Sequence, residues 1–280
     1  MPSAHETAYP RLMASVTAKD LAEVYTPTAA EIALASSTSR TEGARLGFLV
    51  LLKTFQRLGY FVLLGEVPQP ILQHISGCLG IAPRPNDLLR YDESGTRRRH
   101  IPAIREFLKV KPFDGQARTL VGAVVRDAAQ TKEDLADLIN ISIEELVRNR
   151  FELPGFTTLL KEARRARSDV HRVFYRRVAQ ALGDDGRDHL DRIPKADDPA
   201  GRSPWNAIRE FSGRPTLTHL GELVDRLHWL KSGNVGAAAF AMVPHVKVQH
   251  FAAEARSLDA ARMRETQPQK RYAMAAALVC

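Results

Sequence analysis

Cysteine is scarce in this sequence: Cys78 and Cys280 are its only two, and neither lies in a Cys-x-x-Cys or Cys/His pattern. Their positions predict neither a disulfide framework nor a zinc site. The first residues, MPSAHETAYPRL, lack the basic and then apolar segment of a signal peptide, which favours the cytoplasm. Lys53 and Arg57 interrupt the apolar stretch at 42–64 before it reaches the ~18 apolar residues of a membrane span, so we expect no membrane partner.

Motifs of the common enzyme classes are also missing. The nine histidines are scattered, with no HExxH pattern and no Ser/His/Asp arrangement. Four aspartates lie close together, but they lack the spacing of a calcium loop and its closing glutamate: Asp184, Asp185, Asp188 and Asp191. The sequence therefore predicts no metal site, no cofactor and no catalytic residue.

Acidic residues are in the minority. The chain has 40 Lys and Arg against 32 Asp and Glu, a net charge of +8, and a pI of about 9.7. A cationic surface concentrates polyanions around it, so nucleic acid and anionic lipid are both plausible partners. Many globular proteins carry a similar excess and bind neither partner, so charge alone does not decide between nucleic acid and lipid. A length of 280 residues allows two or three small domains.

Strand-like alternation is scarce, whereas helix-start signals are frequent. Four Thr or Ser residues are followed three positions later by an acidic residue, the capping-box spacing: Thr17/Asp20, Thr28/Glu31, Thr131/Asp134 and Ser142/Glu145. We therefore predict an all-α fold. Helices are expected near residues 17–24, 28–36, 42–58, 68–79, 115–130, 158–182, 217–231, 246–263 and 271–280, with shorter turns at 87–91 and 187–193.

The segment 42–58 is predicted to be the central core helix. Leu46, Leu49 and Phe55 recur at spacings that a helix can bury, and apolar residues also fill its flanks. A helix that is apolar nearly all round is surrounded by other elements. Arg45, just before the apolar run, could anchor a phosphate or pair with a carboxylate.

A first basic segment runs over residues 96–113. Arg98, Arg105 and Lys109 share one face at helical spacing, which can match a row of phosphates. The alternative is a solvated face, because charge runs usually are that. We interpret Pro102 as the first turn of this helix, which would leave Arg97 to Arg99 in the preceding loop.

A second basic segment follows. Residues 131–156 are compatible either with two helices joined at Asn140–Ile141, a helix-turn-helix, or with one unbroken helix. In the long helix from about residue 158, apolar residues such as Val170, Val173 and Phe174 face the core. A stripe of cations, interrupted by Asp169, lies on another face: Lys161, Arg165, Arg172 and Arg176.

Five segments together resemble the N-terminal region of Tn3-family transposases in order and spacing. They are ARLGF at 44–48, TRRRHIPAIREFLKVKPF at 96–113, DLINISIEELVRNRFELPGFTTL at 137–159, RPTLTHLGELVDRLHWL at 214–230 and KVQHFAAEARSLDAARM at 247–263. The resemblance implies tandem small helical DNA-binding units that recognise the terminal inverted repeats of a transposon as double-stranded DNA. We assign residues 1–113 to the first unit, 114–182 to the second, 183–201 to a linker and 202–280 to a helical dimerisation region.

In that family the cutting and joining belong to an RNase H-like domain near the C-terminus, where three carboxylates hold two metal ions. We expect this chain to stop before that domain and to be no enzyme by itself, but a cytoplasmic bacterial protein that is nucleoid-associated when bound. Pro102 departs from the family pattern. The alternative function is a helical protein-interaction or homodimerisation module without DNA specificity of its own.

Following the resemblance, DNA contact is assigned to basic residues of both units. In the first unit these are Arg45, Arg97, Arg98, Arg99, Arg105, Lys109 and Lys111. In the second they are Arg148, Arg150, Arg164, Arg165, Arg167, Arg172 and Arg176.

Overall fold

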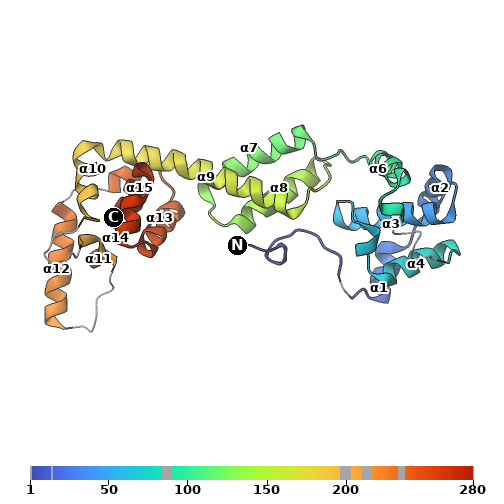
Figure 1. Cartoon of the computed structure of the whole chain (residues 1–280), viewed down its shortest axis with the longest axis horizontal. Coiled ribbons are helices and arrows are strands. Elements are labelled where there is room, and N and C mark those ends of the chain that lie inside the picture. Colours follow the sequence, from blue (N-terminus) through green and yellow to red (C-terminus); the bar gives the residue numbers. More distant parts are fainter. Residues whose placement is uncertain are drawn as a thin grey trace. The chain divides into compact units, whose positions relative to one another are not determined.

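The protein is described by a computed structural model that covers residues 2–13, 15–82, 90–195, 203–209, 216–232 and 237–279. In these ranges it is built from helices, with no β-strand beyond an isolated parallel bridge between Lys111 and Phe151 (Figure 1). The prediction of an all-α fold is confirmed. None of the helices in the described ranges is both long and apolar enough to cross a bilayer.

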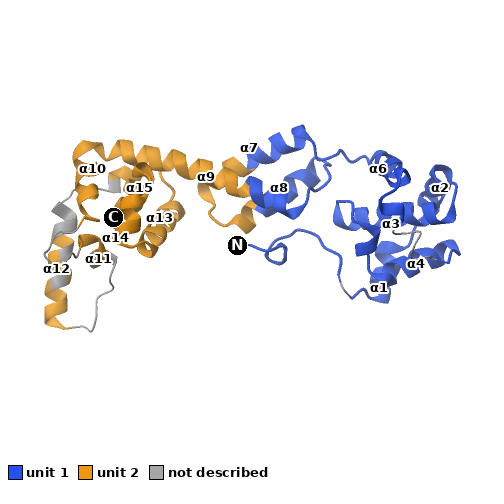
Figure 2. Ribbon diagram, in the orientation of Figure 1, with its two compact units in different colours: residues 1–124, 139–162 blue, residues 125–138, 163–280 orange. Residues whose placement is uncertain are grey.

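The chain divides into two compact units (Figure 2). Unit 1 comprises residues 1–124 and 139–162, and unit 2 comprises residues 125–138 and 163–280. The division falls inside three helices, so it follows packing rather than chain order. The four segments assigned from the sequence remain a prediction.

Unit 1 is centred on α3 (Glu42–Leu58), as the sequence predicts. Every residue from Leu46 to Phe55 is buried. Thr41 caps its first turn, and Gly59 ends it with a positive φ of 75° that glycine adopts without steric cost. The helices that pack on it are α2 (Ala29–Thr38), α4 (Gln69–Leu79) and α6 (Gly95–Leu108).

Lys53, which appeared to interrupt the apolar run, is buried with a partner. Its Nζ lies 3.4 Å from Oε2 of Glu31 on α2. Glu31 also accepts a hydrogen bond from Gln56 Nε2 at 2.7 Å and closes the predicted capping box with Thr28. A buried charge needs such partners, so this pair fixes how α2 packs on α3.

The first helix is shorter and less regular than expected. The predicted Thr17 capping box forms at α1 (Ala18–Asp20), after which the chain continues as a π-helical turn over Leu21–Tyr25. Of the short turn predicted at 87–91, residues 87–89 lie outside the described residues.

The prediction that Pro102 marks the first turn of its helix is wrong. α6 begins at Gly95, and Pro102 lies in its middle. Ser94 sets the start, because its side chain accepts a hydrogen bond from the backbone N–H of Arg97 at 3.2 Å. Proline is usually confined to the first turn of a helix, and this preference misplaced the start. Residues 97–99 are therefore helical rather than part of a loop.

Three long helices follow in the chain: α7 (Gly115–Thr131), α8 (Leu135–Arg148) and α9 (Phe156–Ala181). α8 is unbroken, so the interpretation with two helices joined at 140–141 is wrong. Two predicted capping boxes do not form either, since Thr131 ends α7 and Ser142 is buried within α8. The start of α8 is marked by Asp134, whose Oδ1 accepts from the Ala136 N–H at 2.8 Å.

Unit 2 contains the remaining helices: α10 (Gly183–Arg192), α11 (Pro204–Arg209), α12 (Leu217–Ser232), α13 (His245–Ser257), α14 (Ala260–Glu265) and α15 (Pro268–Val279). The single helix expected at 246–263 is two helices, because Asp259 caps α14 by accepting from the Arg262 N–H at 2.8 Å. α10 starts at Gly183, earlier than the turn predicted at 187–193. α13 packs on α15 to form the core of this part.

Candidate nucleic-acid interface

α9 carries a row of exposed arginines. Arg165, Arg172 and Arg176 follow at intervals of seven and four residues, so they share one helix face. At ~1.5 Å per residue this row extends over about 16 Å, which spans several phosphates of a DNA strand. Asp169 lies beside the row and pairs with Arg172. The opposite face is buried and holds Ala163, Ala166, Val170, Phe174 and Val178.

Val173 departs from the predicted apolar face of α9. It is 43% exposed, although the periodicity of the helix predicts it on the core-facing side. It directly follows Arg172, and the α9 surface is therefore partly apolar beside the arginine row.

Arg97 and Arg105, both predicted DNA contacts, hold carboxylates within unit 1. Arg105 binds both oxygens of Glu152, through Nε at 3.0 Å and Nη2 at 2.9 Å. Arg97 Nε lies 3.4 Å from Asp92 Oδ1, and its Nη2 donates to the Val62 carbonyl at 3.1 Å. Both arginines thus tie segments of the unit together, and DNA contact through them stays a prediction.

The other α6 arginines are more accessible. Arg98 and Arg99 are exposed, and Arg99 Nη2 donates to Thr96 Oγ1 at 3.3 Å. Arg45, in the first turn of α3, is partly buried. Its Nε is buried and has no hydrogen-bond partner among the described residues.

Lys109 and Arg150 occupy left-handed backbone conformations, with φ of 54° and 56°. Among the described residues, no other residue except glycine has a positive φ. Lys109 directly follows α6, and Arg150 lies two residues beyond α8. In both places the next N–H donates to the carbonyl five residues back at 2.9 Å, which is the bond that closes a helix end.

These two helix ends pair with each other. The Lys111 N–H donates to the Arg150 carbonyl at 2.8 Å, and the Glu152 N–H donates to the Lys111 carbonyl at 2.9 Å. The Lys111 ammonium lies 4.8 Å from the centre of the Phe151 ring, within cation–π range. Arg148, one residue before this turn, is exposed and pairs with Glu145 at 2.8 Å.

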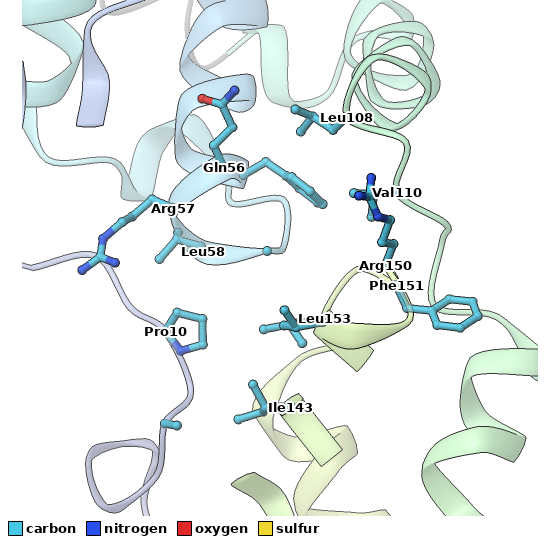
Figure 3. Close-up of a pocket in the computed structure, with 14 residues that line it drawn as sticks. Pro10, Gln56, Arg57, Leu58, Leu108, Val110, Ile143, Arg150, Phe151 and Leu153 are labelled. Carbon is cyan, nitrogen blue, oxygen red and sulfur yellow. The ribbon is translucent and has the colours of Figure 1, made fainter. Parts of the chain in front are cut away.

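An apolar cavity of about 490 Å³ opens beside the paired helix ends. Leu58, Ile143 and Leu153 are directed into it, whereas Arg57 points away (Figure 3). Within the described part of the chain, Arg57 and Arg150 are its only ionisable lining residues. The residues that line the cavity therefore offer no carboxylate or imidazole for acid–base chemistry.

Unit 2 holds a partly buried ionic cluster around Glu133. Oε2 of Glu133 lies 2.9 Å from His171 Nε2 and 2.5 Å from Lys247 Nζ. Its Oε1 lies 3.5 Å from Arg167 Nη1 and 3.4 Å from His250 Nε2. Burial alone would raise the pKa of Glu133, but the hydrogen bonds and charges of His171 and Lys247 lower it to about 2.

The same cluster meets the distance requirement of a metal site but not its charge requirement. One ligand atom each from Glu133, His171 and His250 lie within 4.8 Å of one another. However, Lys247 is fully buried and, with Arg167, already neutralises the carboxylate. A divalent cation would meet two fixed positive charges there, and we assign no metal to it. Arg167 is thus a structural partner of Glu133, and Arg164 beside it is partly buried.

Sequence reasoning did not find the Glu133 cluster. Its members come from the α7–α8 connection, α9 and α13, which are far apart in the chain. No local spacing brings them together. The one available signal was that Lys247 and His250 lie in the segment KVQHFAAEARSLDAARM, whose apolar pattern leaves a lysine on a buried face.

Comparisons with known proteins agree over most of the chain. Residues 1–166 match the model of a family described as "Domain of unknown function (DUF4158)". The transposase for transposon Tn501 of Pseudomonas aeruginosa is 26% identical over 265 residues, which are 93% of this chain and 26% of that protein. The transposase for transposon Tn21 of Escherichia coli is 26% identical over 241 residues, 84% of this chain and 24% of that protein.

A relative of lower sequence identity matches a similar share of this chain. The transposase for transposon Tn1546 of Enterococcus faecium is 21% identical over 238 residues, 84% of this chain and 24% of that protein. The chain therefore spans about a quarter of the length of the curated relatives it matches.

Proposed function

Because the chain belongs to the DUF4158 family and corresponds to the N-terminal region of Tn3-family transposases, we propose that it binds the terminal inverted repeats of a transposon. The ligand is double-stranded DNA, and the chain acts in DNA transposition. In this proposal the described residues hold and position DNA, and we assign no step of strand cutting or joining to them. Residues 1–113 and 114–182 are the two DNA-binding units.

The arginine row of α9 carries this proposal. Arg165, Arg172 and Arg176 are exposed along one face of a helix whose other face is buried, so the helix is held with its cations outward. A row of guanidinium groups suits phosphates and can also reach guanine edges. Arg98 and Arg99 supply a second exposed group on α6. Two weak sites on one chain reinforce each other through effective concentration.

The test is DNA binding by the full chain, measured by fluorescence anisotropy on duplexes selected from a random pool and titrated against salt. Arg165→Glu with Arg172→Glu should lower affinity at least a hundredfold and flatten the salt slope by about two, one for each phosphate that the variant no longer neutralises. Weak binding that is equal for all sequences would contradict recognition of a specific end.

The matched control reverses the same amount of charge elsewhere in unit 2. Lys195 and Arg262 are exposed and lie outside the α9 row. Lys195→Glu with Arg262→Glu should change affinity much less than the α9 pair. Equal weakening in both double variants would mean that net charge, and not the row, drives binding.

A second candidate function is self-association through α12, which a separate observation favours. Leu217, Leu220, Val224 and Leu227 are 88%, 57%, 41% and 55% exposed. Their spacing of three, four and three residues is the seam of a coiled coil. Two chains paired along this seam would form a homodimer, which is compatible with DNA binding by the remaining helices.

A further inference from the structure

We infer that the paired ends of α6 and α8 form a phosphate clamp, made of Lys109, Lys111 and Arg150, that grips the DNA backbone. This inference rests on the proposed DNA binding. It specifies which residues of unit 1 hold the duplex without reading its sequence.

The backbone at Lys109 and Arg150 is the first evidence. With φ of 54° and 56°, both residues occupy the left-handed region, where a Cβ atom crowds the neighbouring carbonyl. Glycine is the usual residue at such a helix end because it avoids this crowding. Two helix ends in one unit instead carry a long cationic side chain, so both positions retain a charge at a conformational cost.

The second evidence is that these two strained positions are joined. Backbone hydrogen bonds of 2.8 and 2.9 Å connect Lys111 to Arg150 and Glu152. Arg150 and Val110, the residue between the two lysines, line the same cavity (Figure 3). These two hydrogen bonds therefore hold the two segments that carry the three cations next to each other. All three residues are exposed.

The third evidence is electrostatic. Glu152, the carboxylate on this segment, already accepts hydrogen bonds from Nε and Nη2 of Arg105 and from the Phe113 N–H at 3.1 Å. Among the described residues no carboxylate pairs with Lys109, Lys111 or Arg150. Three cations without a carboxylate partner suit the phosphodiester backbone, which offers closely spaced single negative charges.

Cations near a helix C-terminus are also favoured by the helix dipole. That effect accounts for a positive charge on the last turn, but glycine in the left-handed position would cost less. It also does not involve Lys111, which lies beyond the end of α6. If the helix dipole alone explained these cations, glycine substitutions would leave DNA binding unchanged. If the cations bind phosphates, the same substitutions weaken DNA binding.

The experiment replaces both strained cations in the full chain, as Lys109→Gly with Arg150→Gly. Thermal unfolding should occur at the same temperature or higher, because glycine relieves the left-handed conformation. Affinity for a duplex selected by the wild-type chain should fall at least tenfold. The slope of log affinity against log salt concentration should become shallower by about two. This slope would not change if the two residues had only a structural role.

Two further variants keep the test decisive. Lys109→Asn with Arg150→Asn removes the same charges with a residue that tolerates this conformation, and it should reproduce the weaker binding. Lys109→Arg with Arg150→Lys retains both charges and should bind within about threefold of wild type. Full affinity in the glycine or asparagine variant overturns the clamp, as does a lower unfolding temperature with an unchanged salt slope. Failure of the wild-type chain to bind any duplex would instead overturn the proposed function itself.

Discussion

Single residues fix the packing of α6 on α3. Tyr91 lies over Gly47, and its hydroxyl is 2.7 Å from Nδ1 of His100, whose Nε2 is 3.1 Å from Ser39 Oγ. The Tyr91, His100 and Ser39 side chains are all buried. Burial lowers the pKa of His100 and favours the neutral ring, which can donate through one nitrogen and accept through the other. These linked side chains therefore set the orientation of the basic helix.

Gly47 gives a prediction at this scale. A Cβ atom there would lie 2.7 to 2.9 Å from three atoms of the Tyr91 ring, so Gly47→Ala should destabilise unit 1 by about 1–3 kcal/mol. Chemical denaturation followed by circular dichroism measures the change.

The control is another helical glycine with the opposite expected sign. A Cβ atom at Gly122 on α7 meets nothing within 4 Å, and alanine in a helix interior is more stable than glycine by ~0.5–1 kcal/mol. Gly122→Ala should therefore stabilise the protein. Stabilisation by both substitutions would show that the Tyr91 ring does not rest on Gly47.

At the scale of elements, α12 exposes the apolar side chains that a soluble helix normally buries. Leu220→Lys with Leu227→Lys should abolish self-association, because charges at the seam of a coiled coil oppose pairing. Both side chains are more than half exposed, at 57% and 55%, so the stability of the monomer should change by under about 0.5 kcal/mol.

Sedimentation equilibrium measures this effect, and Asp225→Lys is the control. Asp225 is exposed on the same helix but lies outside the seam. Equal weakening by all variants, or a monomeric wild-type chain, would argue against α12 as the dimerisation surface.

At the scale of the whole molecule, the Glu133 cluster predicts a stability that depends on pH. Burial is the main cause that lowers the pKa of His250, and it outweighs the opposing effect of the nearby Glu133 carboxylate. The folded state then binds fewer protons than the unfolded state, whose histidine pKa is about 6.5. The stability that the neutral His250 ring contributes is thus present above pH ~6.5 and is lost as the pH falls below that value.

A second decline follows at lower pH. The pKa of Glu133 is about 2 in the folded protein against an ordinary value of 4.5, so its contribution, about 3 kcal/mol, is present above pH ~4.5 and disappears towards pH 2. Urea unfolding between pH 8 and pH 3 should show both declines.

The assignment of the first decline can be tested with one pair of variants. His250→Gln should flatten the dependence between pH 6.5 and 5, whereas His245→Gln, at an exposed position on the same helix, should not. An unaltered profile in His250→Gln would place the titration on other histidines.

The sequence by itself determined the helical class and the family. Apolar residues at helical spacing over 42–58, and the Thr17 and Thr28 caps, are local signals that need no partner segment. The resemblance rested on five segments in register, and the comparisons confirm it. The exposed row on α9 also followed from its periodicity, because one face of a long helix must be apolar to pack.

Only the tertiary structure decided which basic side chains pair with a carboxylate. Arg105 and Arg167 look like Arg98 and Arg165 in sequence, yet they hold Glu152 and Glu133 across distant segments. The start of α6 was likewise decided by Ser94 against the local preference of Pro102. Ion pairs, left-handed helix ends and buried lysines depend on what packs opposite them, and a pattern along one chain segment does not contain that information.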